Sequence, residues 1–247
     1  MRQGLSALAI ALCGGCSAQI SDARDPSVGS IDPMPDAGPT PTTDAGVIAA
    51  CTSRTVFLNF DGQTLTQGPS DATLNQARWM TIRLGAAPPY LAGSNGRSAA
   101  IQSISDGVRS QLSQFPIKVT TTRPSSGNYV MIVFGGDASL VGSNFSAAVN
   151  QLDCGDLRPN DVAWIADTVT GQRAINTAIG AIGFGLGLTA TTDPRDCMCS
   201  WDNRCSPNNS LPCRLGSPIA RDPTARQLCP GVTSQDEVAA FRTAFCE

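Results

Sequence analysis

One uncharged stretch constrains the fold more than any other part of this sequence. Residues 174–192 contain no Asp, Glu, Lys or Arg and include four glycines, at positions 180, 183, 185 and 187. The length would suit a membrane span, but Asn, Thr and Gly lower its apolarity. The alternating glycines would suit a phosphate-binding loop, but the remaining residues of a Rossmann or P-loop sequence motif are missing. The stretch best fits a buried helix, where each glycine costs about 1 kcal/mol against alanine and needs a packing reason.

The amino terminus predicts export. Residues 1–16 contain an early arginine, an apolar run from Leu5 to Leu12, and then Cys13-Gly14-Gly15-Cys16. This order is typical of a signal peptide that ends in small residues. The segment resembles a bacterial lipoprotein signal, which implies that Cys16 is lipidated and anchors the mature chain to a membrane. Cleavage and release without a lipid is the alternative, because Cys13 stands where such signals usually carry leucine.

Residues 17–50 are predicted to be a disordered linker. They contain five Asp and five Pro among many Ser, Thr, Gly and Ala, with few large apolar side chains. Such a composition cannot bury enough surface to offset the entropy of ordering, and the prolines keep the segment extended. The folded domain is therefore expected over residues 51–247, held away from the membrane by this linker.

The overall composition excludes several classes of function. The chain is 41% hydrophobic and 15% charged, which is enough apolar material for one core. Its 17 basic and 20 acidic residues give a net charge of -3, so no basic surface for nucleic acid is indicated. Histidine is absent, which excludes Ser-His-Asp and Cys-His catalysis as well as zinc bound by imidazole.

The cysteines indicate a domain stabilised by disulfides. Apart from Cys13 and Cys16, the chain has eight: Cys51, Cys154, Cys197, Cys199, Cys205, Cys213, Cys229 and Cys246. An even number in an exported chain favours four disulfides, although the spacing leaves their pairing open. A zinc cluster within the dense group from Cys197 to Cys213 is the alternative. It is disfavoured because the repeated C-x-x-C spacing is absent.

Hydrophobic patterns predict an α/β or α+β domain with a sheet. Strands are expected, from β-branched and aromatic runs bounded by turn residues, over 55–60, 117–122, 129–134 and 161–167. The run over 129–134 is apolar throughout, which is typical of a central strand.

Two helices are predicted besides the uncharged stretch. A helix is expected over 96–115, because one apolar stripe combines Ile101, Ile104, Val108 and Leu112. Near the C-terminus, the spacing of a Ser-x-x-Glu capping box, residues 234–237, predicts the start of a terminal helix with Val238, Phe241 and Phe245 on its apolar face.

The segment Gly180-Ala181-Ile182-Gly183-Phe184-Gly185-Leu186-Gly187-Leu188-Thr189-Ala190 resembles the active-site helix of the metzincin metalloproteases. Their pattern is H-E-x-x-H-x-x-G-x-x-H, followed by a turn that carries methionine. Gly187 falls on the glycine of the pattern, and Met198 is similar to the methionine of that turn. The resemblance covers residues 51–247. It implies a zincin-like α/β (α+β) fold with a mixed sheet, an early helix, a degenerate active-site helix and a disulfide-rich C-terminal region.

The resemblance also implies that the catalytic positions are lost. The three zinc-ligand positions fall on Gly180, Phe184 and Ala190, and the general-base position falls on Ala181. Hydrogen, phenyl and methyl groups have no lone pairs for a metal, and the family's hydrolysis needs both the metal and the base. The expectation is an inactive homologue of zinc metalloproteases that uses no metal or other cofactor.

Three functions follow as hypotheses. The first is a pseudoprotease in the cell envelope, anchored in the outer membrane, whose former substrate cleft binds a peptide or protein. The second is a structural envelope protein in which Trp201 is a packing anchor between the cysteines. The third is a hydrolase that uses a free thiol or carboxylates, with candidates Asp61, Asp137, Asp161, Asp167 and Asp193. Aspartates at strand ends and in loops more often bond to their own turns, which disfavours the third hypothesis.

Overall fold

A computed structural model describes residues 54–199, 201 and 205–245, which belong to one unit, Gly46–Glu247. The predicted signal peptide with Cys16, the predicted linker, and the two cysteines at positions 51 and 246 lie outside the described residues. Within the part that is described, no helix combines the length and apolarity needed to cross a membrane.

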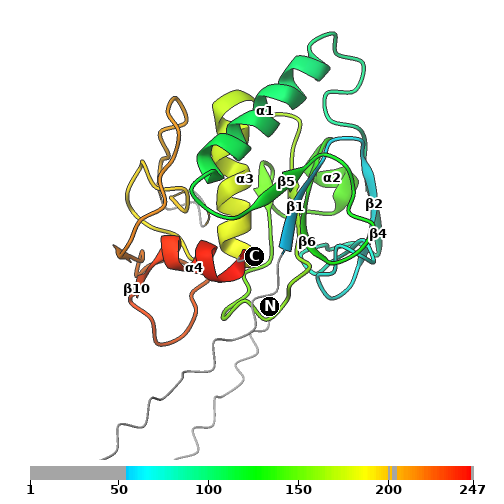
Figure 1. Cartoon of the computed structure of the whole chain (residues 1–247). Helices are drawn as coiled ribbons and strands as arrows, with labels where there is room; N and C mark the ends of the chain where they lie inside the picture. The colour runs from blue at the N-terminus through cyan, green and yellow to red at the C-terminus, as the bar shows by residue number, and fades with distance from the viewer. Residues whose placement is uncertain (1–53, 200, 202–204, 246–247) are drawn as a thin grey trace, which may run out of the picture. The chain divides into compact units, whose positions relative to one another are not determined.

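The main sheet has five strands in the order β5-β1-β6-β8-β7 (Figure 1). They are β1 (Arg54–Asn59), β5 (Lys118–Thr120), β6 (Asn128–Phe134), β7 (Ala148–Val149) and β8 (Val162–Ile165). Neighbouring strands are parallel except β7, which runs antiparallel to β8. The four strands predicted from the sequence are all present. The prediction of a central strand is confirmed, because β6 lies in the middle of the sheet with its side chains buried from Tyr129 to Phe134.

Two long helices, α1 (Arg97–Leu112) and α3 (Gly171–Gly185), pack side by side against the main sheet (Figure 1). The apolar stripe predicted for α1 is confirmed. Ile104, Val108 and Leu112 are buried, and Ile101 is partly buried against the same core.

A smaller sheet covers the opposite side of the main sheet. It consists of β2 (Gln63–Gln67), β3 (Gln76–Ala77) and β4 (Leu84–Ala87) in the order β3-β2-β4, and the short helix α2 (Ala138–Val141) packs against β4. In Figure 1, β1, β5 and β6 separate α1 and α3 from β2 and β4. The fold is therefore a mixed α/β (α+β) arrangement, as the sequence predicts.

The C-terminal region is rich in disulfides. It contains β9 (Ile219–Ala220), antiparallel β10 (Ser234–Gln235) and helix α4 (Glu237–Ala244). The disulfides are Cys154–Cys229, Cys197–Cys213 and Cys199–Cys205. The dense group of cysteines thus forms disulfides and not a zinc cluster. Disulfides persist in oxidising compartments, which places the domain outside the cytoplasm.

The predicted capping box at residues 234–237 is wrong. Ser234 belongs to β10, and the N-cap of α4 is Asp236, whose side chain accepts a hydrogen bond from Ala239 N at 2.8 Å. Glu237 is buried and accepts hydrogen bonds from Gly216 N (2.8 Å) and Gln235 Nε2 (2.7 Å). Asp236 therefore provides the local cap of α4, and Glu237 bonds instead to its neighbour Gln235 and to Gly216, 21 positions earlier in the chain.

The uncharged stretch is helical only in its first part. Helix α3 ends at Gly185, and Gly187 follows with a φ of +82°, in the left-handed region. The N–H groups of Leu186 and Leu188 both donate to the carbonyl oxygen of Gly183, at 3.0 Å. A glycine after the last turn ends a helix in this way because it lacks a Cβ. The prediction of a buried helix is correct for residues 174–185 and wrong for residues 186–192.

The change Gly187→Ala should lower the free energy of unfolding by about 1–3 kcal/mol, because a left-handed backbone is strained for any other residue. An added Cβ would also lie 2.7 Å from the backbone oxygen of Asp153. Gly171→Ala is a matched control, since Gly171 has a φ of +55° but no atom within 4 Å of a new Cβ. Urea unfolding would compare the two, and an equal loss in both variants would contradict the predicted contact with Asp153.

Candidate binding cavity between β7 and α3

A cavity of about 380 Å³ lies between strand β7 and helix α3, and we call it the β7–α3 cavity. Residues 144–150, which include β7 and the loop before it, line one part of the wall. Helix α3 contributes Arg173, Thr177 and Phe184. The C-terminal region contributes the remaining lining residues, which are Trp201, Cys205, Pro207, Asn209 and Gln227.

The residues from α3 share one face of the helix. Arg173, Thr177 and Phe184 are separated by four and seven positions, and side chains at such spacings project from the same side of a helix. Gly180 falls on this face as well. The cavity therefore extends along one face of α3, from Arg173 in its first turn to Phe184 in its last. Of the segment that resembles the metzincin motif, only Phe184 is among the described lining residues.

Trp201 fills the space at the first two predicted zinc-ligand positions. Its ring stacks on Phe184 with centroids 5.2 Å apart and an angle of 28° between the planes. A Cβ at Gly180 would overlap the indole nitrogen of Trp201 and would lie 2.6 Å from the backbone oxygen of Cys197. Gly180 therefore has a packing reason to lack a side chain, because the indole lies directly against α3.

The turn that carries Trp201 is fixed by two disulfides and by Met198. Cys197 is linked to Cys213, and Cys199 is linked to Cys205. Met198 is fully buried, and its sulfur lies 2.7 Å from the ideal Cβ position of Gly183. Met198 thus packs directly against α3 at Gly183.

Of the four motif positions, only Phe184 is among the described residues that line the cavity. Ala181 is fully buried, and its carbonyl oxygen accepts a hydrogen bond from Asn150 Nδ2 at 2.8 Å. Ala190 is also fully buried, and its carbonyl oxygen accepts from Asp222 N at 2.8 Å. The residues at the motif positions do not fit a zinc ion, because none has a donor side chain and Trp201 covers Gly180. No cluster of three or more His, Cys, Asp or Glu side chains suited to a metal occurs among the described residues.

Strand β7 has an open edge beside the cavity. Among the described strands, it pairs only with β8. Ala147 O accepts a hydrogen bond from Ala166 N at 2.8 Å. Residues of an antiparallel strand point their backbone groups alternately toward and away from the neighbouring strand. The N–H and C=O groups of Ala148 therefore point away from β8 and are available to another strand.

A partly buried cluster of charges lies next to the cavity. Arg54 donates to both carboxylate oxygens of Asp156, at 2.7 and 2.6 Å, and Arg158 forms an ion pair with Asp153 at 3.0 Å. Asp161 is fully buried, its carboxylate lies 3.8 Å from Arg158 Nε, and its two oxygens have no hydrogen-bond partner in the part of the chain that is described. Burial and the negative charge of Asp153 raise the pKa of Asp161 to about 8.

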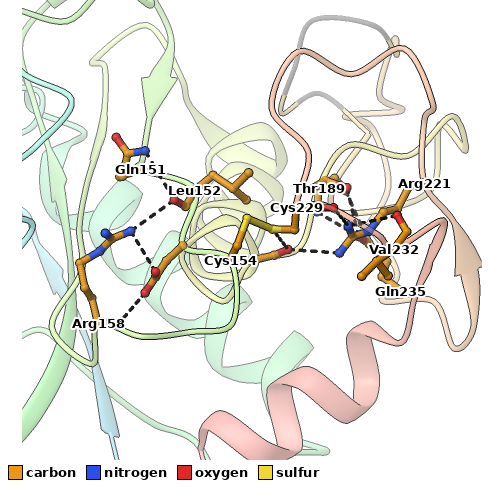
Figure 2. Close-up of a disulfide and its surroundings, with 11 residues drawn as sticks. Gln151, Leu152, Cys154, Arg158, Thr189, Arg221, Cys229, Val232 and Gln235 are labelled. Carbon is orange, nitrogen blue, oxygen red and sulfur yellow. Dashed lines mark hydrogen bonds and ion pairs between the residues drawn. A yellow bond between two sulfur atoms is a disulfide. The ribbon is translucent and has the colours of Figure 1, made fainter. Parts of the chain in front are cut away.

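Figure 2 shows how the segment after β7, which carries Cys154 and Arg158, is attached to the C-terminal region. The Cys154–Cys229 disulfide lies between Arg158 on one side and Arg221 on the other. Arg221 donates to Cys229 O at 3.2 Å and to Gln235 Oε1 at 3.1 Å. The disulfide therefore joins the segment after β7 to the strand pair β9 and β10.

A second buried carboxyl group has a raised pKa. Burial, followed by the negative charge of Asp196, raises the pKa of Glu237 to about 8, and burial also raises the pKa of Asp196. Asp196 accepts a hydrogen bond from Met198 N at 2.7 Å. This pair connects the turn beneath α3 to the start of α4.

The other candidate carboxylates have structural roles. Asp61 forms an exposed ion pair with Arg97 at 2.8 Å, Asp137 caps α2, Asp167 accepts from Leu91 N at 2.9 Å and Asp193 accepts from Arg195 N at 2.8 Å. None of these four lines the β7–α3 cavity. Every cysteine within the described ranges is in a disulfide, so that part of the chain has no free thiol.

The sequence does not predict the residues that form the cavity wall opposite α3. Strand β7 is only two residues long, so it has no detectable alternation of polar and apolar side chains. Arg173 was not predicted either, because it lies just before the uncharged stretch 174–192, whereas α3 begins at Gly171. No protein-family model matches the chain, and no curated protein matches it.

Proposed function

We propose that this chain is an exported lipoprotein whose metalloprotease-like domain is inactive and binds an extended peptide or protein segment. The lipid would be attached to Cys16 and would anchor the chain in the outer membrane. The signal-like residues 1–16 support export, and the three disulfides agree with an oxidising compartment.

One observation carries the proposal of a binding function. Phe184, which falls on the second zinc-ligand position of the resemblance, lines the β7–α3 cavity, and Trp201 stacks there on Phe184 in place of metal ligands. A cleft of this kind can keep a ligand after the loss of the groups that would cleave it.

The open edge of β7 suggests how a ligand binds. An extended peptide can add to an exposed sheet edge through backbone hydrogen bonds, while neighbouring pockets select its side chains. Ala148 would supply the backbone donor and acceptor for this pairing, and the cavity next to it would accept side chains.

The proposal is tested with a library of extended peptides and the oxidised chain, by measuring binding, cleavage and zinc content together. We expect binding without cleavage and without stoichiometric zinc. The change Ala148→Pro should weaken binding about tenfold or more, because it removes the outward N–H while the bonds to β8 remain. A matched control is Ala138→Pro in the first turn of α2, outside the cavity, where proline is tolerated. Cleavage with bound zinc, or unchanged binding by Ala148→Pro, would contradict the proposal.

A further inference from the structure

Arg173 is the one charged side chain among the described residues that line the β7–α3 cavity. It is exposed, and no ion pair or hydrogen bond to it occurs within the described part of the chain. The rest of the lining consists of amide, hydroxyl, aliphatic and aromatic groups and one disulfide sulfur. The cavity thus has a positive charge that no described carboxylate of its wall neutralises.

The position of Arg173 is not explained by the stability of α3. It lies in the first turn of the helix, where the positive end of the helix dipole disfavours a cation. That turn contains no acidic residue, and the side chain of the N-cap, Thr170, makes no capping hydrogen bond. The arginine therefore adds to a positive potential at this end of the cavity.

The opposite end of the same helix face is aromatic. Phe184 and Trp201 stack there, and both line the cavity. Stacked rings offer an apolar surface for a large side chain of a ligand. The cavity therefore presents one positive end and one apolar end along α3.

We infer that the β7–α3 cavity selects peptides in which a carboxylate lies three to five residues from a large apolar side chain. The inference rests on the proposed function, since it assumes an extended peptide beside β7. The carboxylate binds the guanidinium of Arg173 through two parallel hydrogen bonds, a geometry that suits these two planar groups. The apolar side chain packs against Phe184 and Trp201.

The spacing follows from the geometry of α3. A helix rises about 1.5 Å per residue, so Phe184 lies roughly 16 Å from Arg173 along the axis, and Gly180, which Trp201 covers, lies roughly 10 Å from it. An extended peptide advances about 3.3 Å per residue. Distances of this size therefore correspond to about three to five peptide residues.

The test uses fluorescent heptapeptides and the full oxidised chain, with binding measured by anisotropy. Each peptide carries Phe and, four residues away, Glu or Gln, with both ends blocked. A further peptide replaces Glu by a free C-terminal carboxylate at the same distance from Phe. The two carboxylate peptides distinguish an internal acidic residue from a chain end, and we expect at least one of them to bind about tenfold more tightly than the Gln peptide.

The variant Arg173→Gln should remove this preference, so that all peptides bind like the Gln peptide. Arg83→Gln is the matched control, because Arg83 is exposed, carries the same charge and does not line the cavity. Equal binding of carboxylate and Gln peptides to the parent chain would overturn the inference, as would a preference that survives Arg173→Gln. If no peptide binds at all, the proposed function fails as well, so the two failures are distinguishable.

Discussion

The free energy of unfolding should fall as the pH rises from about 5 to about 8, and the change Asp161→Asn should remove a large part of this fall. Burial, with the negative charge of Asp153, raises the pKa of Asp161 from 3.8 to about 8. Between these values the folded chain holds a proton that the unfolded chain releases. The folded state is therefore favoured at low pH, and this advantage is lost as the pH approaches 8.

The size of the effect follows from proton linkage. Between its unfolded and folded pKa values, one such carboxyl group lowers the free energy of unfolding by about 1.4 kcal/mol for each unit that the pH rises. Asp161→Asn keeps the shape of the side chain without its charge, so the variant should show a shallower slope and greater stability than the parent at pH 8. Urea unfolding at several pH values, with the disulfides intact, measures both quantities.

Glu237 provides an independent comparison, because burial and the charge of Asp196 raise its pKa from 4.5 to about 8. The change Glu237→Gln should therefore reduce the slope by a similar amount. Asp161 and Glu237 have different partners, so their effects should add. In the double variant, the free energy of unfolding should therefore depend less on pH than in either single variant. A slope that is the same in the parent and in Asp161→Asn would show that Asp161 is ionised in the folded chain.

Removing the Cys154–Cys229 disulfide should lower the free energy of unfolding by about 4.5 kcal/mol, from the entropy of the unfolded chain. The two cysteines are 75 positions apart, so the link shortens a long loop. It also joins the segment after β7 to the region of Arg221 and Gln235 (Figure 2). The double change Cys154→Ser and Cys229→Ser, measured by urea unfolding near pH 6, tests this expectation.

The Cys199–Cys205 disulfide is the matched control for loop length. Its cysteines are only 6 positions apart, so the same double change to serine should cost about 2.4 kcal/mol. Both experiments replace one disulfide by two serines. The difference between the two losses in free energy of unfolding therefore measures the effect of loop length. An equal loss in both would contradict the loop-entropy explanation.

The candidate site was only partly predictable from the sequence. The uncharged stretch indicated the helix that forms one wall of the cavity, and the resemblance to the metzincin motif singled out Gly180 and Phe184. Trp201 was noted only as a packing residue. Its stacking on Phe184 depends on a turn held by two disulfides, whose pairing the spacing of the cysteines did not decide.

Local patterns in the sequence determined the main strands, the face of α1, the formation of disulfides and the absence of zinc-binding side chains at the motif positions. These features depend on the periodicity of apolar residues, the number of cysteines and the chemistry of single side chains, all of which can be read directly from the sequence. Only the tertiary structure decided that Asp161 is buried, that Glu237 bonds to Gly216 rather than capping α4, and that β7 forms an edge beside Arg173. Burial and pairing of this kind arise between segments far apart in the chain, so no local pattern records them.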